Sequence, residues 1–230
     1  PILDGIENVK DLLEEKVSDV IDDAKDKVSD TAKGGLNAVG KVAGKIFDSS
    51  KNWLTGGGSG NGFVSQFDSK YKDMKYADST VSEKGCAPAV AAMVASKYGK
   101  KYGMDQAIKD STKYQNKDGT SIDYFKAALG GQGISTNYIQ GANSAQQITQ
   151  ALANGNQVIL LGRDANNTSK DASPFGPNNH YVVATGLDKN GNLIINDPES
   201  DAPKTYSANI LKSINAGIDT SSSGSGGNYD

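Results

Sequence analysis

The stretch KGCAPAVAAMVASKYG, residues 84–99, is the clearest helix in the chain, and the predicted fold is built around it. It is rich in alanine, carries Pro88 in the first turn, where proline is tolerated, and reaches Gly99, a typical helix stop. Cys86 opens this helix. The thiol is therefore expected at a helix N-terminus, which has a partial positive charge and free N–H groups.

Shorter helices and strands are predicted downstream. The helices fall at residues 104–109, at residues 121–129 and from a capping box at residues 144–147 to Gly155. The strands fall at residues 157–162, 180–187 and 193–196, and the turn sequence DKNGN at residues 188–192 joins the last two into a hairpin. Helices followed by an antiparallel sheet predict an α+β domain over residues 63–218.

The composition excludes several classes of function. The chain has 24 Lys and Arg against 27 Asp and Glu, and its formal net charge of −3 gives no electrostatic case for binding nucleic acid. One cysteine and one histidine allow no intrachain disulfide and only half of a zinc shell, so neither a metal nor another cofactor is predicted. The sequence contains no apolar run of about 18 residues, so no membrane span is predicted. No secretory signal peptide is visible either.

Residues 1–55 predict an amphipathic helical segment ahead of the α+β domain. Apolar residues recur every three or four positions, and Ile6, Val17 and Val28 lie on one stripe. The opposite face is mainly acidic, which favours packing on a neighbouring helix, on another protein or on a second copy of the chain. Contact with a membrane surface is the weaker interpretation, because membrane-surface helices usually carry a basic face.

Glycine-rich sequence separates this segment from the domain. Residues 34–54 mix small, apolar and lysine residues, and in composition they resemble parts of phage tail tape-measure proteins. The sequence GGGSGNG, residues 56–62, is typical of a flexible linker. The Ser- and Gly-rich residues 219–230 predict a flexible tail.

Cys86 stands where a reactive thiol is expected. A thiol attacks as the thiolate, and the partial charge at a helix N-terminus favours that form. Gly85 removes side-chain bulk before the thiol, and Ala87 leaves room for a substrate carbonyl beside backbone N–H groups. The structural alternative is a buried cysteine that serves as a small apolar residue.

His180 and Asp197 stand where a general base and its orienting acid are needed. His180 follows the polar loop of residues 164–179 and opens a strand, and Asp197 ends the next strand before Pro198. An even hairpin places Asp197 about level with His180, so that the carboxylate can orient the imidazole. The alternatives are a structural or exposed histidine and a turn-forming aspartate.

Three motifs in this order resemble the C39-like cysteine peptidases of the papain-like superfamily. The motifs are GCAPAVAAM at residues 85–93, HYVVATG at residues 180–186 and INDP at residues 195–198. The resemblance spans residues 63–218 and implies a papain-like fold, with the cysteine helix packed on an antiparallel sheet.

The resemblance also implies roles for single residues. Cys86 would be the nucleophile, His180 the general base and then acid, and Asp197 the orienter. Family members usually carry a glutamine a few residues before the cysteine, which helps to hold the oxyanion, but residues 76–84 contain none. The expected substitutes are the hydroxyls of Ser82 and Thr80 and the backbone N–H of Cys86.

These features predict a cysteine peptidase that binds a peptide and needs no cofactor. The favoured substrate is a stem or cross-link peptide of peptidoglycan, cut by a phage tail-associated cell-wall hydrolase in the virion, outside the cell or at the cell wall. One alternative is a secreted or leader-processing peptidase that cuts double-glycine leaders. Another is a degenerate domain that only binds other tail proteins.

Overall fold

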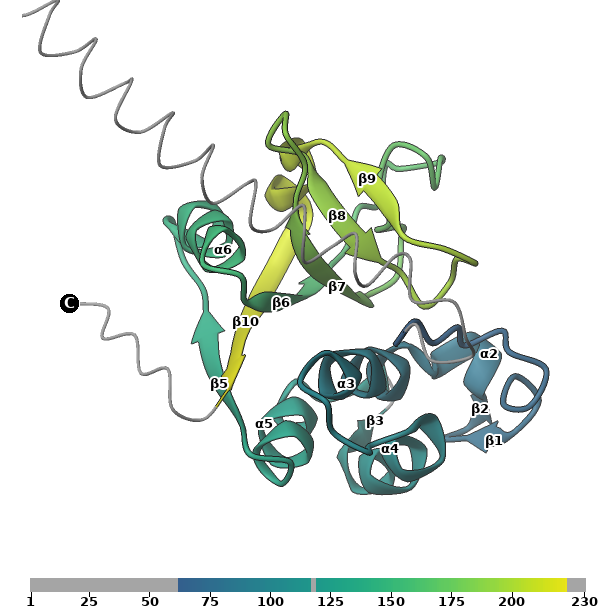
Figure 1. The fold of residues 1–230 in the computed structure, drawn as a ribbon. Coiled ribbons are helices and arrows are strands. Elements are labelled where there is room, and N and C mark those ends of the chain that lie inside the picture. The colour runs from purple at the N-terminus through teal and green to yellow at the C-terminus, as the bar shows by residue number, and fades with distance from the viewer. Residues whose placement is uncertain (1–61, 117–118, 223–230) are drawn as a thin grey trace, which may run out of the picture. The chain divides into compact units, whose positions relative to one another are not determined.

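The structure is a computed structural model that describes residues 62–116 and 119–222 (Figure 1). The predicted helical segment of residues 1–55 lies outside the described residues, as do residues 56–61 of the linker and residues 223–230. Within the described part, no helix is both long and apolar enough to cross a bilayer.

A six-stranded antiparallel sheet forms the centre of the described fold, in the order β5-β10-β6-β7-β8-β9. Its strands are β5 (Ile134–Ile139), β6 (Gln157–Gly162), β7 (His180–Leu187), β8 (Leu193–Asn196), β9 (Lys204–Tyr206) and β10 (Ile214–Ser222). Two short ladders join β1 (Lys75–Tyr76) to β2 (Ser79–Thr80) and β3 (Gln115–Asn116) to β4 (Gly119–Thr120). The predicted strands β6, β7 and β8 are confirmed, as is the α+β class.

Helices pack on both faces of this sheet. They are α2 (Val81–Lys84), α3 (Cys86–Lys97), α4 (Met104–Ser111), α5 (Asp123–Gly130) and α6 (Ser144–Ala153), with the 3-10 turns η1 (Thr112–Tyr114) and η2 (Ala208–Ser213). Figure 1 shows α3, α4 and α5 gathered together and α6 apart from them. Each face of the sheet has its own hydrophobic core, and alternate residues of β7 point into one or the other. Tyr181 and Val183 pack with α3 and α5, whereas Val182 and Ala184 pack with α6.

The central helix α3 is buried along most of its length because its side chains are small. Residues 87–95 are all buried, and the helix packs against β7, α4 and α5. A helix that is apolar around its whole circumference belongs in the interior of a domain. Gly85 allows α2 to run into α3, because a Cβ at this position would lie 2.4 Å from the carbonyl oxygen of Val81.

Strand β10 corrects the predicted domain boundary. Residues 219–222, expected in a flexible tail, belong to the sheet. Asp219 accepts a hydrogen bond of 2.9 Å from the side-chain amide of Asn156, and the hydroxyl of Thr220 donates to the carbonyl of Gln157 over 2.8 Å. Because these buried polar groups find partners, a strand of polar residues is stable in the interior.

The predicted capping box at residues 144–147 is wrong. Ser144 is already the first residue of α6, the N-cap is Asn143, and no side chain caps the helix. The backbone N–H of Gln147 donates to the carbonyl of Asn143 over 3.0 Å, as in an ordinary helical turn. Ser144 thus lies one position too late to act as the cap. The predicted stop is confirmed, since Gly155 follows the helix with a φ of 83°.

We expect Gly162→Ala to destabilise the domain, because β6 ends against an aromatic ring. A Cβ at Gly162 would lie 2.6 Å from ring carbons of the buried Phe175. Overpacking of this kind costs about 1–3 kcal/mol in the free energy of unfolding, which urea denaturation would measure. Gly176→Ala is the matched control, because nothing lies within 4 Å of the added Cβ. Equal stability of the two variants would contradict this packing.

Candidate active site

The three residues predicted to carry chemistry meet at one end of the sheet. Cys86 is the first residue of α3, His180 is the first residue of β7, and Asp197 directly follows β8. Cys86 and His180 line the same cavity, which has a volume of about 730 Å³. The fold therefore brings together the thiol and the imidazole that the sequence keeps 94 residues apart.

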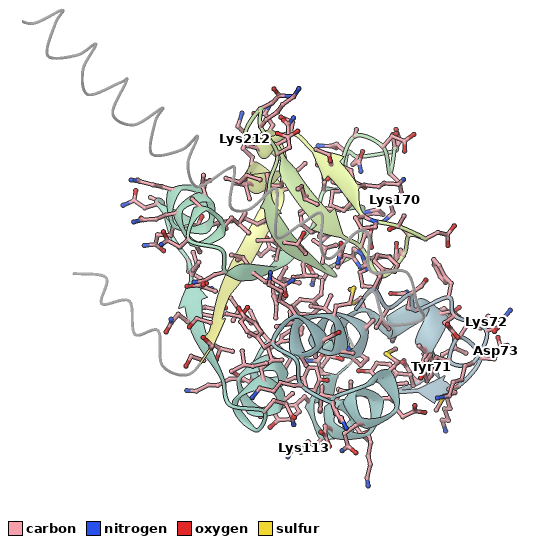
Figure 2. The ribbon with its side chains drawn as sticks, in the orientation of Figure 1. Tyr71, Lys72, Asp73, Lys113, Lys170 and Lys212 are labelled. Carbon is pink, nitrogen blue, oxygen red and sulfur yellow. The ribbon has the colours of Figure 1, made fainter. Side chains whose placement is uncertain are left out.

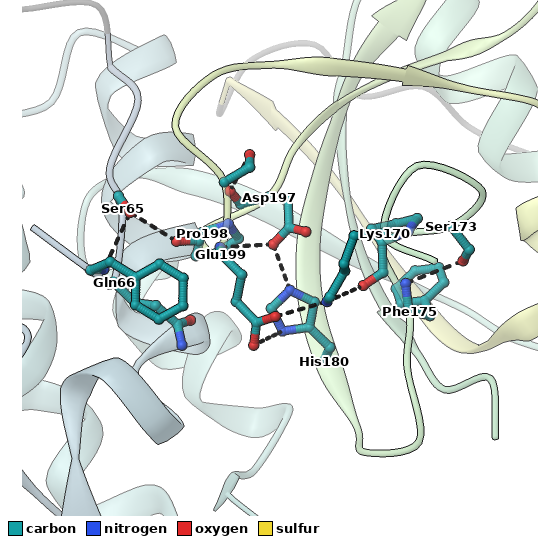
Figure 3. Close-up of polar contacts among 12 residues, drawn as sticks. Ser65, Gln66, Lys170, Ser173, Phe175, His180, Asp197, Pro198 and Glu199 are labelled. Atoms are coloured by element: carbon teal, nitrogen blue, oxygen red, sulfur yellow. Dashed lines mark hydrogen bonds and ion pairs between the residues drawn. The ribbon is translucent and has the colours of Figure 1, made fainter. Parts of the chain in front are cut away.

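A short hydrogen bond joins His180 to Asp197. The Nε2 atom of His180 lies 2.6 Å from Oδ1 of Asp197, and the two side chains are only 6% and 3% exposed (Figure 3). The hairpin is not even, because the register shifts between Ala184 and Gly186. Continuing the pairing of Val183 with Asn196 would place Asp197 opposite Val182 and not His180. The carboxylate thus reaches His180 diagonally along one face of the hairpin.

Asp197 also shapes the turn that holds it. Its Oδ1 accepts a hydrogen bond of 2.9 Å from the backbone N–H of Glu199, and its carbonyl accepts one of 2.9 Å from the backbone N–H of Ser200. The structural interpretation of Asp197 as a turn-forming residue is therefore correct, and the same oxygen also binds the imidazole. The turn fixes the carboxylate before any substrate binds.

Electrostatics favour a protonated His180 beside an ionised Asp197. Burial alone would lower the pKa of His180, but side-chain hydrogen bonding to Asp197 and to Cys86 outweighs it and raises the pKa to about 10. Burial would raise the pKa of Asp197, but the His180 hydrogen bond and charge lower it overall. The imidazolium form is thus stabilised at neutral pH.

The hydrogen bond to Asp197 also limits which imidazole nitrogen is available to a thiol. Because Nε2 is bonded to Asp197, Nδ1 is the ring atom that remains for Cys86. Cys86 is half-buried and is a free thiol. The thiol is therefore accessible from the cavity, which does not fit a cysteine that only fills space in a core.

The loop between β6 and β7, residues 163–179, has a defined structure and carries one wall of the cavity. The side-chain amide of Asn167 donates to the carbonyls of Ser173 and Phe175 over 3.1 and 2.6 Å. The fully buried Phe175 anchors the loop in the core on the α6 side of the sheet. The loop then delivers Asn178 and Asn179 to the cavity, directly before His180.

The hydroxyls predicted to replace an oxyanion glutamine are engaged with each other. Thr80 Oγ1 and Ser82 Oγ lie 2.9 Å apart, and neither residue is among those that line the cavity. The backbone N–H of Cys86 keeps its expected place at the first residue of α3. Of the three predicted donors, Cys86 is therefore the one whose residue lines the cavity.

Gln66 lies next to this segment and was missed from the sequence. It is 1% exposed, and its Nε2 donates to the carbonyl of Ser82 over 2.7 Å. Its backbone N–H donates to the carbonyl of Pro198 over 2.9 Å, next to Asp197. Its Oε1 has no hydrogen-bond partner in the described structure. Gln66 precedes Cys86 by 20 residues, so a search of the residues just before the cysteine cannot find it.

Comparison with known proteins identifies a family. The family model described as "Peptidase_C39 like family" matches residues 61–216, which is more than half of the chain. No curated protein matches the chain. The peptidase domain of Streptococcus ComA, a bifunctional ABC transporter involved in quorum sensing, is 22% identical, with a TM-score of 0.49, and the match covers 70% of this chain and 97% of that one.

A second solved structure is a double glycine motif protease from an AMS/PCAT transporter in complex with its leader peptide. It is 18% identical, with a TM-score of 0.43, and the match covers 59% of this chain and 82% of that one. The assignment to a family depends on the match over residues 61–216 and not on these two structures.

We expect stability to fall as pH rises through the titration of His180. Its pKa is raised from 6.5 to about 10 on folding, so its contribution is fully present below pH 6.5 and is lost as pH approaches 10. Urea unfolding between pH 6 and pH 10 measures the slope. Asp197→Asn removes the main interaction that raises the pKa, so the slope should flatten. If the free energy of unfolding of Asp197→Asn depends on pH as steeply as that of the wild type, the hydrogen bond to Asp197 is not what raises the pKa of His180.

Proposed function

Because the chain belongs to the C39-like family of cysteine peptidases, we propose that Cys86, His180 and Asp197 form its catalytic triad. The observation that carries this proposal is the buried 2.6 Å hydrogen bond between His180 and Asp197, on an imidazole that also interacts with the only thiol of the chain. A nucleophile, a base and an orienting acid in this arrangement define thiol acyl transfer.

The proposed reaction has two halves. The thiolate of Cys86 attacks the scissile carbonyl, and Nδ1–H of His180 protonates the leaving amine nitrogen, which leaves a thioester on Cys86. The neutral imidazole then takes a proton from a water molecule as that water attacks the thioester, and the acid product departs. Asp197 stays ionised throughout, in keeping with its lowered pKa.

We assign the oxyanion site to the backbone N–H of Cys86 and to the amide of Gln66. Gln66 is buried and, like Thr80 and Ser82, does not itself line the cavity. One hydrogen of its Nε2 is donated to the carbonyl of Ser82, and we propose that the second is donated to the oxyanion. The bond to Ser82 and the bond from the Gln66 backbone N–H to Pro198 fix this residue between the segment before the thiol and the segment that carries Asp197. Such fixed donors stabilise developing charge without reorganisation.

For the substrate, we propose a stem or cross-link peptide of peptidoglycan. The cavity of about 730 Å³ is lined by the cationic side chains of Lys84, Arg163 and Lys170 and by the acidic side chains of Glu83 and Glu199. Lys84 is paired with Asp78 and Lys170 with Glu199, so Arg163 and Glu83 are the lining charges outside these pairs. A cavity that offers one cation and one anion suits a short peptide that carries both carboxylates and amines, as stem peptides do. A Gly-Gly segment has no side chains to match such charges, so a double-glycine leader is the second candidate.

The setting that we propose is a phage tail or the cell wall, outside the cytoplasm. It is supported by the sequence alone: the amphipathic residues 1–55, the tape-measure-like composition of residues 34–54 and the glycine-rich linker. In this setting residues 1–55 would bind other tail proteins or a second copy of the chain. The alternative is a domain that binds tail proteins without catalysis, and such a domain would cut neither peptidoglycan nor a Gly-Gly peptide.

Peptide hydrolysis is expected to depend on Cys86. Purified peptidoglycan and a synthetic Gly-Gly peptide would each be incubated with the wild type and with Cys86→Ala, and new amino groups would be counted. We expect release from peptidoglycan by the wild type only. Cleavage of the Gly-Gly peptide alone would favour a leader peptidase, and no release from either substrate would favour the binding module.

We expect Gln66→Met to lower kcat by about 10²–10³-fold, the usual effect of losing one oxyanion donor. Methionine keeps the length and removes the amide. Alkylation of Cys86 by iodoacetamide forms no tetrahedral oxyanion, so its rate should hold if the variant is folded. Thr80→Val is the matched control and should keep kcat. A kcat that falls with Thr80→Val and holds with Gln66→Met would return the oxyanion role to the hydroxyls.

A further inference from the structure

A second carboxylate lies beside the imidazole, on the side of Nδ1, the nitrogen that the proposed function assigns to Cys86. Glu199 Oε1 is 3.8 Å from Nδ1 of His180, whereas Asp197 occupies Nε2 (Figure 3). At 3.8 Å the carboxylate is too far for a hydrogen bond but close enough for a strong charge interaction. Glu199 also lines the cavity, and its side chain is 29% exposed.

Lys170 holds this carboxylate in place from the loop between β6 and β7. Its Nζ lies 2.7 Å from Glu199 Oε2 and also donates to the carbonyl of Pro174 over 2.8 Å. The hydroxyl of Tyr206 in β9 donates to the backbone carbonyl of Lys170 over 2.9 Å. In Figure 2 Lys170 lies beside the strands of the sheet. The pair is thus fixed at both ends, unlike a freely moving surface ion pair.

The other charged groups around the imidazole either have partners of their own or lie elsewhere on the cavity wall. Asp197 is bound to Nε2 of His180, and Cys86 interacts with the ring. Lys84 at the end of α2 pairs with Asp78 over 2.5 Å. Glu83 and Arg163 complete the charged lining of the cavity. Among the described residues, the ion pairs of His180 are with Asp197 and Glu199, and Glu199 is the one on the Nδ1 side.

We infer that Glu199, restrained by Lys170, is a positioning residue that controls the charge and aim of the His180 imidazole for Cys86. This inference rests on the proposed thiol peptidase function. The carboxylate stabilises the imidazolium from the Nδ1 side. The contact of 2.7 Å between Lys170 Nζ and Glu199 Oε2 holds the carboxylate away from Nδ1. Glu199 therefore does not accept the Nδ1–H that the thiolate and the leaving amine need. The pair therefore keeps His180 protonated and at the same time leaves its Nδ1–H free to reach the thiolate and the leaving amine.

The balance predicts opposite effects from the two halves of the pair. Glu199→Gln removes the negative charge and leaves Lys170 unpaired near the ring, so the pKa of His180 should fall. Lys170→Gln frees the Glu199 carboxylate to approach Nδ1, so the pKa of His180 should rise. Each shift should be about one pH unit, the lower end for a charge within 4–6 Å. A pair that only braced the loop, without electrostatic effect on the ring, would produce no shift in either variant.

The single histidine makes the test direct, because an untagged chain has one imidazole NMR signal. The signal would be followed from pH 5 to pH 11 in the wild type and both variants. Lys204→Gln is the matched control, since Lys204 forms an ion pair of 3.3 Å with Asp171 of the same loop. It should leave the titration unchanged. Shifts of the same sign in the two variants, or no shift in either, would overturn the inference.

Cys86→Ser separates this inference from the proposed function. The interaction with Cys86 raises the pKa of His180, so serine should lower it. If serine leaves the titration unchanged while the Glu199 and Lys170 variants shift it in opposite directions, the Cys86–His180 pair fails, and only the control of the His180 charge by Glu199 and Lys170 stands. If serine lowers the pKa and the other variants do nothing, the triad stands and the role of Glu199 fails.

Discussion

The hydrogen bond between His180 and Asp197 is the interaction on which the rest of the site depends. Both side chains are almost fully buried, and an unpaired buried charge would be costly. The register of β7 and β8 and the turn after Asp197 bring the two together. The residues that open the described domain support that turn, because Ser65 and Gln66 both donate to the carbonyl of Pro198. Orientation of the base is therefore built into the sheet before substrate arrives.

The helix α3 supplies the other half of the arrangement. Its alanines allow it to pack against β7, α4 and α5, so the position of its first residue is fixed by burial along its length. Gly85 permits the tight junction with α2 that precedes the thiol. A rigid helix end and a rigid sheet end then meet at one cavity, and the loop between β6 and β7 contributes Lys170 as the partner of Glu199. Precision at the site thus comes from packing that lies away from it.

The sequence predicts the parts of this site that have a local signal. The cysteine helix, the strand that begins with His180 and the strand that ends before Asp197 follow from alanine content, apolar runs and turn residues. β10 has a weak signal, since its buried polar residues are stabilised only by tertiary hydrogen bonds. Gln66 and Glu199 depend on contacts through space, and no local pattern marks either one. The predicted segment of residues 1–55 lies outside the described residues and stays a prediction.

The central claim is that Asp197 fixes Nε2 of His180 and leaves Nδ1 for Cys86. Selective ¹⁵N labelling of the one histidine, followed by alkylation of the one cysteine, tests this most directly. The account predicts a strongly downfield Nε2–H proton that persists after alkylation, together with a large change in the Nδ1 resonance. A change confined to Nε2, or no change in either nitrogen, would contradict it.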